Sequence, residues 1–335
     1  MRSGDTAGTR ERDSAGSRDT VRVDRDIVFA RPGDADLLLD LYRPARTSRP
    51  VPVVLWLHGG GWFTGDRTLA PDLARRVAAT GLAMASVEYR LSGQALFPAQ
   101  LHDVRSAIRY LRQHAEKYGL DPRLIGVWGA SAGGHLAALA GLTGHLDVLP
   151  GEENTLGSAA VQAVAESYAP VDLIAGVEAA QEALPGTDAA ASPEARLLGG
   201  HPADRPDAAG QANPLTWVSA AAPPFQISHG TGDVLVSHRQ SERLHAALVA
   251  AGVPSELYLL DGYRHGFLNP AGRLDVQLAR VMDDGRLEQE GSARATYSSS
   301  AAPAAEQTMF GLDRVDAFFT RHLDRTPPST TGDTR

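Results

Sequence analysis

Residues 127–134 read Val-Trp-Gly-Ala-Ser-Ala-Gly-Gly and join two unlike segments. Before them, residues 124–128 are apolar and typical of a buried strand, and a helix-forming run follows. Ser131 therefore stands at a turn from strand to helix, between Gly129 and Gly133, in the pattern G-x-S-x-G. Such a turn is strained and crowded, so it needs glycine on both sides of the serine. The pattern predicts a nucleophile at the positive end of a helix dipole.

The pentapeptide also occurs by chance in many chains, so other residues must decide its meaning. Acyl transfer through a serine needs a base for the hydroxyl proton, an acid that orients the base, and donors for the oxyanion. Ligands of open α/β sheets bind beyond the carboxyl ends of the strands. Asp233 follows the strand-like run 225–229, and His265 follows the strand-like run 256–260. The order Ser, Asp, His along the chain is that of the α/β-hydrolases.

A second glycine cluster, His-Gly-Gly-Gly at residues 58–61, also follows an apolar run. Backbone N–H groups in such a loop can approach a substrate oxygen closely because glycine has no side chain. The N–H groups of Gly60, Gly61 and Ala132 are predicted to form an oxyanion hole. Trp62 comes next and is a candidate substrate-binding residue, although packing in the core explains it nearly as well.

Composition excludes several classes of function. The chain has 335 residues, of which 43% are hydrophobic and 21% charged, an ordinary balance for a protein with a sizeable core. The net charge of −8 argues against nucleic acid as a partner, and the longest apolar runs are too short to span a membrane. The absence of cysteine excludes disulfides and thiolate catalysis. We expect no cofactor or metal, since no metal-ligand spacing links the remaining histidines, which include His102, His135, His201, His229 and His238.

The ends of the chain differ from its middle. Residues 1–22 are polar and lack the apolar core of a secretory signal, so we expect a disordered leader and a cytoplasmic protein. Residues 326–335 are predicted to be a loose tail. Residues 23–325 are predicted to form a single domain.

Strand-like and helix-like segments alternate through this domain, which predicts a mostly parallel sheet with helices on both faces. Two stretches interrupt the alternation. Residues 172–222 are predicted to be a small cap insertion, and residues 269–307 a long mobile loop. The eight expected strands are residues 26–30, 37–42, 51–57, 82–89, 124–128, 159–168, 225–229 and 256–260, of which the first two form an antiparallel pair.

These motifs together resemble those of serine carboxylesterases with the α/β-hydrolase fold. The resemblance is to the bacterial hormone-sensitive-lipase-like branch, nearest its feruloyl/acetyl-xylan-esterase-like and kynurenine-formamidase-like group. It implies Ser131 as nucleophile, His265 as general base and then acid, and Asp233 as its orienting partner. It also implies a small-molecule ester with a small or aromatic acyl group as substrate. The matching stretches are residues 57–62, 87–92, 97–100, 121–123, 129–136, 223–225, 229–233 and 265–267.

Several alternatives remain open at this stage. The same triad could cleave amides or formamides, or pass the acyl group to an alcohol or amine. A non-catalytic small-ligand receptor and a metal-assisted hydrolase are less favoured, because no triad member is missing and no metal-ligand set is present. The oligomeric state, monomer or dimer, is undetermined. Outside the triad, His58 is expected to stiffen its loop, and Asp103 and Glu88 to pair with arginines such as Arg90 or Arg105.

Overall fold

A computed structural model describes residues 20–33, 36–186, 188–272, 281–302 and 304–324. The predicted leader lies almost entirely outside these residues, and the predicted tail lies wholly outside them. The first strand begins at Val21, two residues before the predicted start of the domain.

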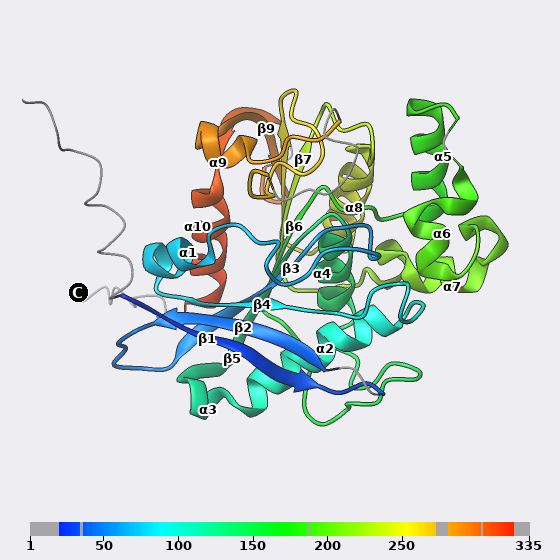
Figure 1. Cartoon of the computed structure of the whole chain (residues 1–335). Coiled ribbons are helices and arrows are strands. Elements are labelled where there is room, and N and C mark those ends of the chain that lie inside the picture. The colour runs from blue at the N-terminus through cyan, green and yellow to red at the C-terminus, as the bar shows by residue number, and fades with distance from the viewer. Residues whose placement is uncertain (1–19, 34–35, 187, 273–280, 303, 325–335) are drawn as a thin grey trace, which may run out of the picture.

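In the described part of the chain, ten strands form one mixed sheet in the order β1-β2-β4-β3-β5-β6-β7-β8-β9-β10 (Figure 1). Neighbouring strands from β4 to β8 in this order are parallel, whereas β1, β2, β9 and β10 pair antiparallel at the two edges. The predicted mostly parallel sheet is therefore confirmed. The strands are β1 (Val21–Ala30), β2 (Leu37–Pro44), β3 (Val51–Leu57), β4 (Ala83–Val87), β5 (Leu120–Ala130), β6 (Ala163–Ser167), β7 (Phe225–Gly230), β8 (Ser255–Leu260), β9 (Ala293–Ser299) and β10 (Glu306–Phe310).

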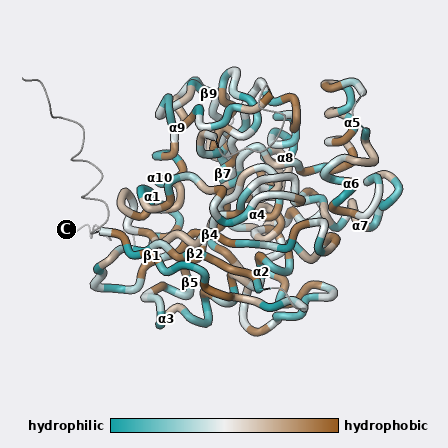
Figure 2. The backbone as a smooth tube through the Cα atoms, in the orientation of Figure 1, coloured by the Kyte–Doolittle hydropathy of each residue, from teal (hydrophilic) through white to brown (hydrophobic). Residues whose placement is uncertain are grey.

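Helices cover both faces of this sheet, as predicted. Along β3, Val53 and Leu55 belong to the core under α2, α4 and α8, whereas Val54 and Trp56 belong to the core under α1 and α10. Successive side chains of a strand point to opposite faces, so a nearly continuous apolar strand is buried on both. Figure 2 shows hydrophobic segments running through the region of β2, β5 and α2. The helices are α1 (Leu73–Thr80), α2 (Ala99–Gln113), α3 (Ala115–Tyr118), α4 (Ala132–Leu142), α5 (Leu173–Ala183), α6 (Pro193–Leu198), α7 (Pro206–Ala212), α8 (Arg239–Ala250), α9 (Arg286–Glu290) and α10 (Leu312–Leu323), with 3-10 turns η1 (Ala189–Ala191), η2 (Pro202–Asp204) and η3 (Pro214–Trp217).

Local signals in the sequence set several helix boundaries. Helix α1 begins after Asp72, whose carboxylate accepts the N–H of Arg75 at 2.9 Å, and it ends at Gly81 with φ of 72°. The segment 98–118 forms two helices in succession, because α2 ends at Gln113 and α3 begins at Ala115, after the cap residue His114.

The segment 269–307 differs from the long loop predicted for it. Its described residues include helix α9, strand β9 and the start of strand β10, so it is not simply a loop, and the described residues form a sheet of ten strands rather than eight. Strand β9 pairs antiparallel with β8, and β10 with β9. The sequence of β9 contains serine and arginine, and β10 is mostly exposed, so neither has the apolar run that identified the central strands. Residues 273–280 of this segment lie outside the described residues.

The segment 172–222 forms a group of short helices rather than strands of the sheet. It contains α5, α6, α7 and the three 3-10 turns, and η3 contacts both α4 and α8. Figure 1 shows α5, α6 and α7 grouped beyond the helices that cover the sheet. Within the described residues, no helix is long and apolar enough to cross a membrane.

Candidate active site

Ser131 lies between the end of β5 at Ala130 and the start of α4 at Ala132. Its backbone has φ of 54° and ψ of −122°, a conformation that non-glycine residues rarely adopt. A side chain at Gly129 would overlap the carbonyl of Gly133, and one at Gly133 would overlap the carbonyl of Leu57. The predicted need for glycine on both sides of the serine is therefore confirmed.

Ser131, His265 and Asp233 meet at the carboxyl ends of three strands. The hydroxyl of Ser131 lies 2.8 Å from His265 Nε2, and His265 Nδ1 lies 2.7 Å from Asp233 Oδ2. Asp233 and His265 are only 7% and 5% exposed, whereas Ser131 is partly exposed. The structure thus brings together three residues that stand far apart in the sequence, with the imidazole of His265 between the hydroxyl and the carboxylate.

The carboxylate of Asp233 is held in one orientation. Its Oδ1 accepts the backbone N–H groups of Leu235 and Val236, each at 2.9 Å, which leaves Oδ2 directed at His265. Burial acts to raise the pKa of Asp233, but the charge of His265 and hydrogen bonds from His229 and His265 outweigh it and hold the pKa well below its usual range. Asp233 is therefore ionised and able to stabilise a positively charged His265.

His229 is a second imidazole at the same carboxylate. Its Nε2 lies 3.3 Å from Asp233 Oδ2 and 2.9 Å from the carbonyl of Val236. Sequence reasoning considered His229 only as a metal ligand and missed this contact. A signal was present, because His229 lies one residue before the end of strand β7, which Asp233 follows, and four residues before Asp233.

Tyr168 supports the loop that carries His265. Its ring packs edge-on against the rings of His265 and Phe267, with centroids 4.8 and 4.6 Å apart. Its hydroxyl oxygen accepts the N–H of Leu268 at 3.4 Å. Tyr168 was predicted only as the end of a strand, and nothing in its local sequence indicates this role.

Asp283 fixes the same loop from the other side. It accepts the backbone N–H of Arg264 at 2.6 Å, and its own N–H donates to the carbonyl of His265 at 2.8 Å. Asp283 is 5% exposed and belongs to the segment predicted to be a mobile loop. Part of that segment therefore holds the candidate base in place.

The glycine loop lies beside the candidate nucleophile. A Cβ added to Gly59 would lie 3.4 Å from the Cβ of Ser131, so the two segments are in direct contact. Gly60 and Gly61 have φ of 110° and 56°, and the carbonyl of Gly60 accepts the N–H groups of residues 63 and 64 at 3.1 Å. Only glycine adopts such a backbone at low cost. The loop thus places bare peptide groups next to Ser131, as an oxyanion hole requires.

His58 stiffens this loop, as predicted. Its Nδ1 lies 2.7 Å from the carbonyl of Gly59, and its ring stacks on Tyr89 with centroids 4.4 Å apart. The Tyr89 hydroxyl donates to the carbonyl of His58 at 2.8 Å. Burial lowers the pKa of His58 to about 4, so the ring is neutral at ordinary pH and Nδ1 donates to the carbonyl.

Trp62 packs in the core next to this loop, and helix α6 contacts the loop at Gly61. Trp62 is 1% exposed and packs edge-on against His135, with ring centroids 5.1 Å apart. A Cβ added to Gly61 would lie 3.1 Å from Pro193 in α6, and the guanidinium of Arg196 lies 4.7 Å from the centre of the Phe63 ring. The insertion at residues 172–222 therefore touches the candidate oxyanion loop.

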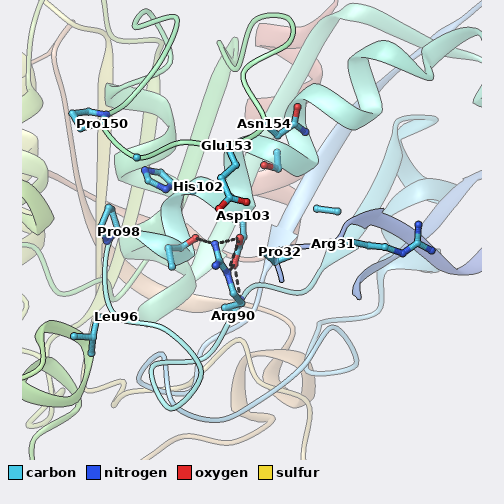
Figure 3. A pocket seen from close by; sticks show the side chains of 14 residues that line it. Arg31, Pro32, Arg90, Leu96, Pro98, His102, Asp103, Pro150, Glu153 and Asn154 are labelled. Atoms are coloured by element: carbon cyan, nitrogen blue, oxygen red, sulfur yellow. Dashed lines mark hydrogen bonds and ion pairs between the residues drawn. The ribbon is translucent and has the colours of Figure 1, made fainter. Parts of the chain in front are cut away.

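Two other acids considered in the sequence, Asp103 and Glu88, form ion pairs. Asp103 receives two side-chain N–H groups of Arg90, at 2.7 and 2.9 Å, beside a surface cavity of about 630 Å³ (Figure 3). This pairing is the predicted one. Glu88 instead pairs with Arg67 and accepts the N–H of Leu38 at 3.2 Å. None of the triad residues lines this cavity.

Among the residues that the structure describes, no group of three or more His, Asp or Glu side chains could hold a metal ion.

The chain is similar to a known protein family and to several esterases. Residues 39–248 match the family model described as BD-FAE. The chain is 34% identical to esterase LipQ of Mycobacterium tuberculosis, over 72% of this chain and 56% of that protein. Two solved structures are also similar. A truncated carbohydrate esterase from gut microbiota has a TM-score of 0.65 and 29% identity, over 74% of this chain and 90% of that one. Thermogutta terrifontis esterase 2, phosphonylated by cyclosarin, has a TM-score of 0.58 and 27% identity, over 77% and 89%.

The curated relatives are longer than this chain. It spans between about half and two thirds of the length of those that it matches over most of its own sequence. The two structures just described are of similar extent, since the chain covers about nine tenths of each.

Proposed function

Since the chain belongs to the BD-FAE family of α/β-hydrolase esterases, we propose that it hydrolyses carboxylic esters through an acyl-enzyme on Ser131. One observation carries the proposal. His265 lies within hydrogen-bond distance of both the Ser131 hydroxyl, at 2.8 Å, and the Asp233 carboxylate, at 2.7 Å. A serine with such neighbours is an activated nucleophile rather than a structural hydroxyl.

The proposed reaction proceeds in two halves. Ser131 Oγ attacks the ester carbonyl carbon while His265 Nε2 takes the hydroxyl proton, and Asp233 stabilises the resulting imidazolium. The tetrahedral intermediate collapses when His265 returns that proton to the departing alcohol, which leaves the acyl group on Ser131. A water molecule then attacks the acyl carbon while His265 Nε2 takes its proton. The second tetrahedral intermediate collapses when His265 returns this proton to Ser131 Oγ, which breaks the bond between the acyl group and Ser131 and releases the acid.

The oxyanion of both tetrahedral intermediates needs preorganised donors. We assign this role to the N–H groups of Gly60, Gly61 and Ala132, because the glycine loop contacts Ser131 and Ala132 opens helix α4. Every residue of α4 is buried, so the positive end of its dipole acts in a poorly solvated environment. Removing one such donor typically costs on the order of 10²–10³ in turnover.

We propose a small-molecule ester with a small or aromatic acyl group as substrate. Two features support this class: the similarity to named esterases, and the contact between α6 and the glycine loop, which places the insertion close to Ser131. Trp62, the candidate substrate-binding residue, directly follows the oxyanion glycines, but its side chain is 1% exposed and packs in the core against His135, so we assign it a packing role instead.

Hydrolysis of p-nitrophenyl acetate and butyrate tests the proposal. The wild type should turn over both esters, with equal rates in the presence and absence of EDTA. Ser131→Ala should reduce turnover to the background rate. Hydrolysis that survives this substitution would exclude the covalent mechanism, and loss of activity in EDTA would indicate a metal. A matched anilide substrate measures the preference for esters over amides.

A further inference from the structure

A buried chain of polar side chains continues from the triad toward strand β6. His229 Nδ1 lies 2.7 Å from the hydroxyl of Ser241 in α8, and this hydroxyl lies 3.4 Å from Glu166 Oε1. The other carboxyl oxygen of Glu166 accepts the N–H of Ala169 at 3.1 Å. Glu166 is 1% exposed, and His229 and Ser241 are both 0% exposed. The reaction proposed above uses none of these three side chains.

The position of one proton on His229 follows from its neighbours. Its Nε2 faces two acceptors, the Val236 carbonyl and the Asp233 carboxylate, so this nitrogen must carry hydrogen. In the neutral ring Nδ1 is then an acceptor, and the group within reach that can donate to it is the Ser241 hydroxyl. The Ser241 proton therefore selects the tautomer of His229.

The orientation of the Ser241 hydroxyl depends in turn on Glu166. The single hydroxyl hydrogen of Ser241 is used in the 2.7 Å contact with His229 Nδ1, so in the relay the hydrogen of the 3.4 Å contact must come from Glu166 Oε1. Burial raises the pKa of Glu166 to about 8, which is consistent with a protonated carboxyl group at this position. Each hydrogen bond is then donated in the direction of the triad: Glu166 donates to Ser241, Ser241 donates to His229, and His229 donates to Asp233.

We propose that Glu166, Ser241 and His229 form a positioning relay, which fixes the His229 tautomer that presents Nε2–H to Asp233. The inference rests on the proposed function of the triad. None of the three residues touches the substrate or the reacting atoms, so they are positioning residues rather than catalytic ones. In the other tautomer a lone pair on Nε2 would face the Asp233 carboxylate, and the repulsion would turn Oδ2 away from His265.

The sharpest kinetic test is Ser241→Ala with Ser228→Ala as its matched control. Ser228 is also a buried serine, 2% exposed, and its hydroxyl bonds Ser167 at 2.8 Å rather than the relay. Ser241→Ala should lower kcat roughly 10-fold, the rate equivalent of about one hydrogen bond, with little change in KM. Ser228→Ala should leave kcat within about twofold of the wild type.

A second pair of variants isolates the donor at Glu166 and serves if Ser241→Ala fails to fold. In Glu166→Gln the amide nitrogen can donate to Ser241 and the amide oxygen can accept from Ala169, so kcat should be retained. Glu166→Leu removes both bonds at similar volume and should lower kcat several-fold. Equal losses in Glu166→Gln and Glu166→Leu would contradict a relay that depends on donation.

Proton NMR tests the relay without turnover. The hydrogen between His265 Nδ1 and Asp233 Oδ2 should give a resonance far downfield, assigned by its absence in Asp233→Ala. Ser241→Ala should shift this resonance, and Ser228→Ala should not. An unmoved resonance together with equal kcat in the two serine variants overturns the relay. If the wild type hydrolyses no ester, the proposed function fails, while the resonance still supports or overturns the relay.

Discussion

Two buried glutamates, Glu152 and Glu166, show opposite ionisation in the same molecule. The carboxylate of Glu152 lies between the guanidinium groups of Arg105 and Arg109 from α2. Burial acts to raise the pKa of Glu152, but hydrogen bonds from these two arginines outweigh it and lower the pKa to about 2. Glu166 has an amide and a hydroxyl as its hydrogen-bond partners, and burial raises its pKa to about 8. The surroundings, rather than the residue type, decide whether a buried acid is charged.

The two environments also have different uses. Around Glu152, Arg105 donates to the carbonyl of Thr143 at 2.7 Å, and Arg109 donates to those of Asp147 and Gly157 at 2.7 and 2.8 Å. This charged cluster ties a long loop to α2.

At the carboxyl edge of the sheet the charged acid is instead Asp233, beside the candidate base. One region therefore serves stability and the other serves the proposed chemistry, and variants in each should separate these effects.

The largest expected effect comes from Ser131→Ala. It should lower turnover of p-nitrophenyl acetate by roughly 10⁶, because the nucleophile is lost. The melting temperature should change by little, since alanine fills the same strained position and the Glu152 cluster is untouched. Steady-state kinetics and thermal unfolding measure the two quantities. Substantial residual turnover, or a large loss of stability, would show that the two regions are not separable in this way.

Glu152→Ala should have the opposite effect: a large loss of stability with unchanged turnover. Removing this carboxylate leaves two buried guanidinium groups without their counterion, which should lower the free energy of unfolding by about 3–5 kcal/mol. The folded variant should keep the kcat of the wild type. Its matched control is Glu153→Ala, at an exposed neighbouring position, where the change should stay within about 0.5 kcal/mol. Chemical denaturation measures the stabilities, and similar values for the two variants would contradict the assigned role of Glu152.

Glu166→Gln should change how stability depends on pH. In the unfolded chain this acid ionises near its ordinary pKa, whereas in the native protein it keeps its proton until about pH 8. The native state therefore binds more protons over this interval, so wild-type stability falls as pH rises. The free energy of unfolding of Glu166→Gln, relative to that of the wild type, should therefore increase by about 2 kcal/mol between about pH 6 and about pH 7.5. A pH-independent difference would show that Glu166 is charged in the native state.

The smallest effect is expected from Tyr168→Phe. The ring that packs against His265 remains, and only the hydroxyl that accepts the N–H of Leu268 at 3.4 Å is lost. Turnover should fall by less than about threefold, the equivalent of under 1 kcal/mol. Tyr168→Ala, which also removes the ring, should reduce turnover further. Equal kinetics in the two variants would mean that the ring does not support the His265 loop.

The sequence predicts the central strands and the candidate triad for one physical reason. Ser131, Asp233 and His265 each follow a segment with a recognisable strand pattern, and the ends of parallel strands meet at one edge of the sheet. Strands β9 and β10 lack that signal, because β9 is partly polar and β10, at the edge of the sheet, is mostly exposed. Their composition is close to that of a loop, which explains the incorrect prediction.

The relay behind Asp233 could not be predicted in the same way. Glu166 and Ser241 are 75 residues apart in the sequence, and their contact depends on how α8 packs beside β6 and β7. The protonation state of Glu166 depends on its burial, which the local sequence does not reveal. His229 was within reach of prediction, since it stands at the end of the strand that leads to Asp233.

Labelling with a fluorophosphonate tests the central claim most directly, since the reagent reacts with serine nucleophiles that a neighbouring base activates. The account predicts one phosphonyl group per chain, located by peptide mass spectrometry on Ser131. Labelling should be lost in Ser131→Ala and strongly slowed in His265→Ala. A label on another residue, or undiminished labelling of Ser131→Ala, would contradict the claim that Ser131 is the nucleophile.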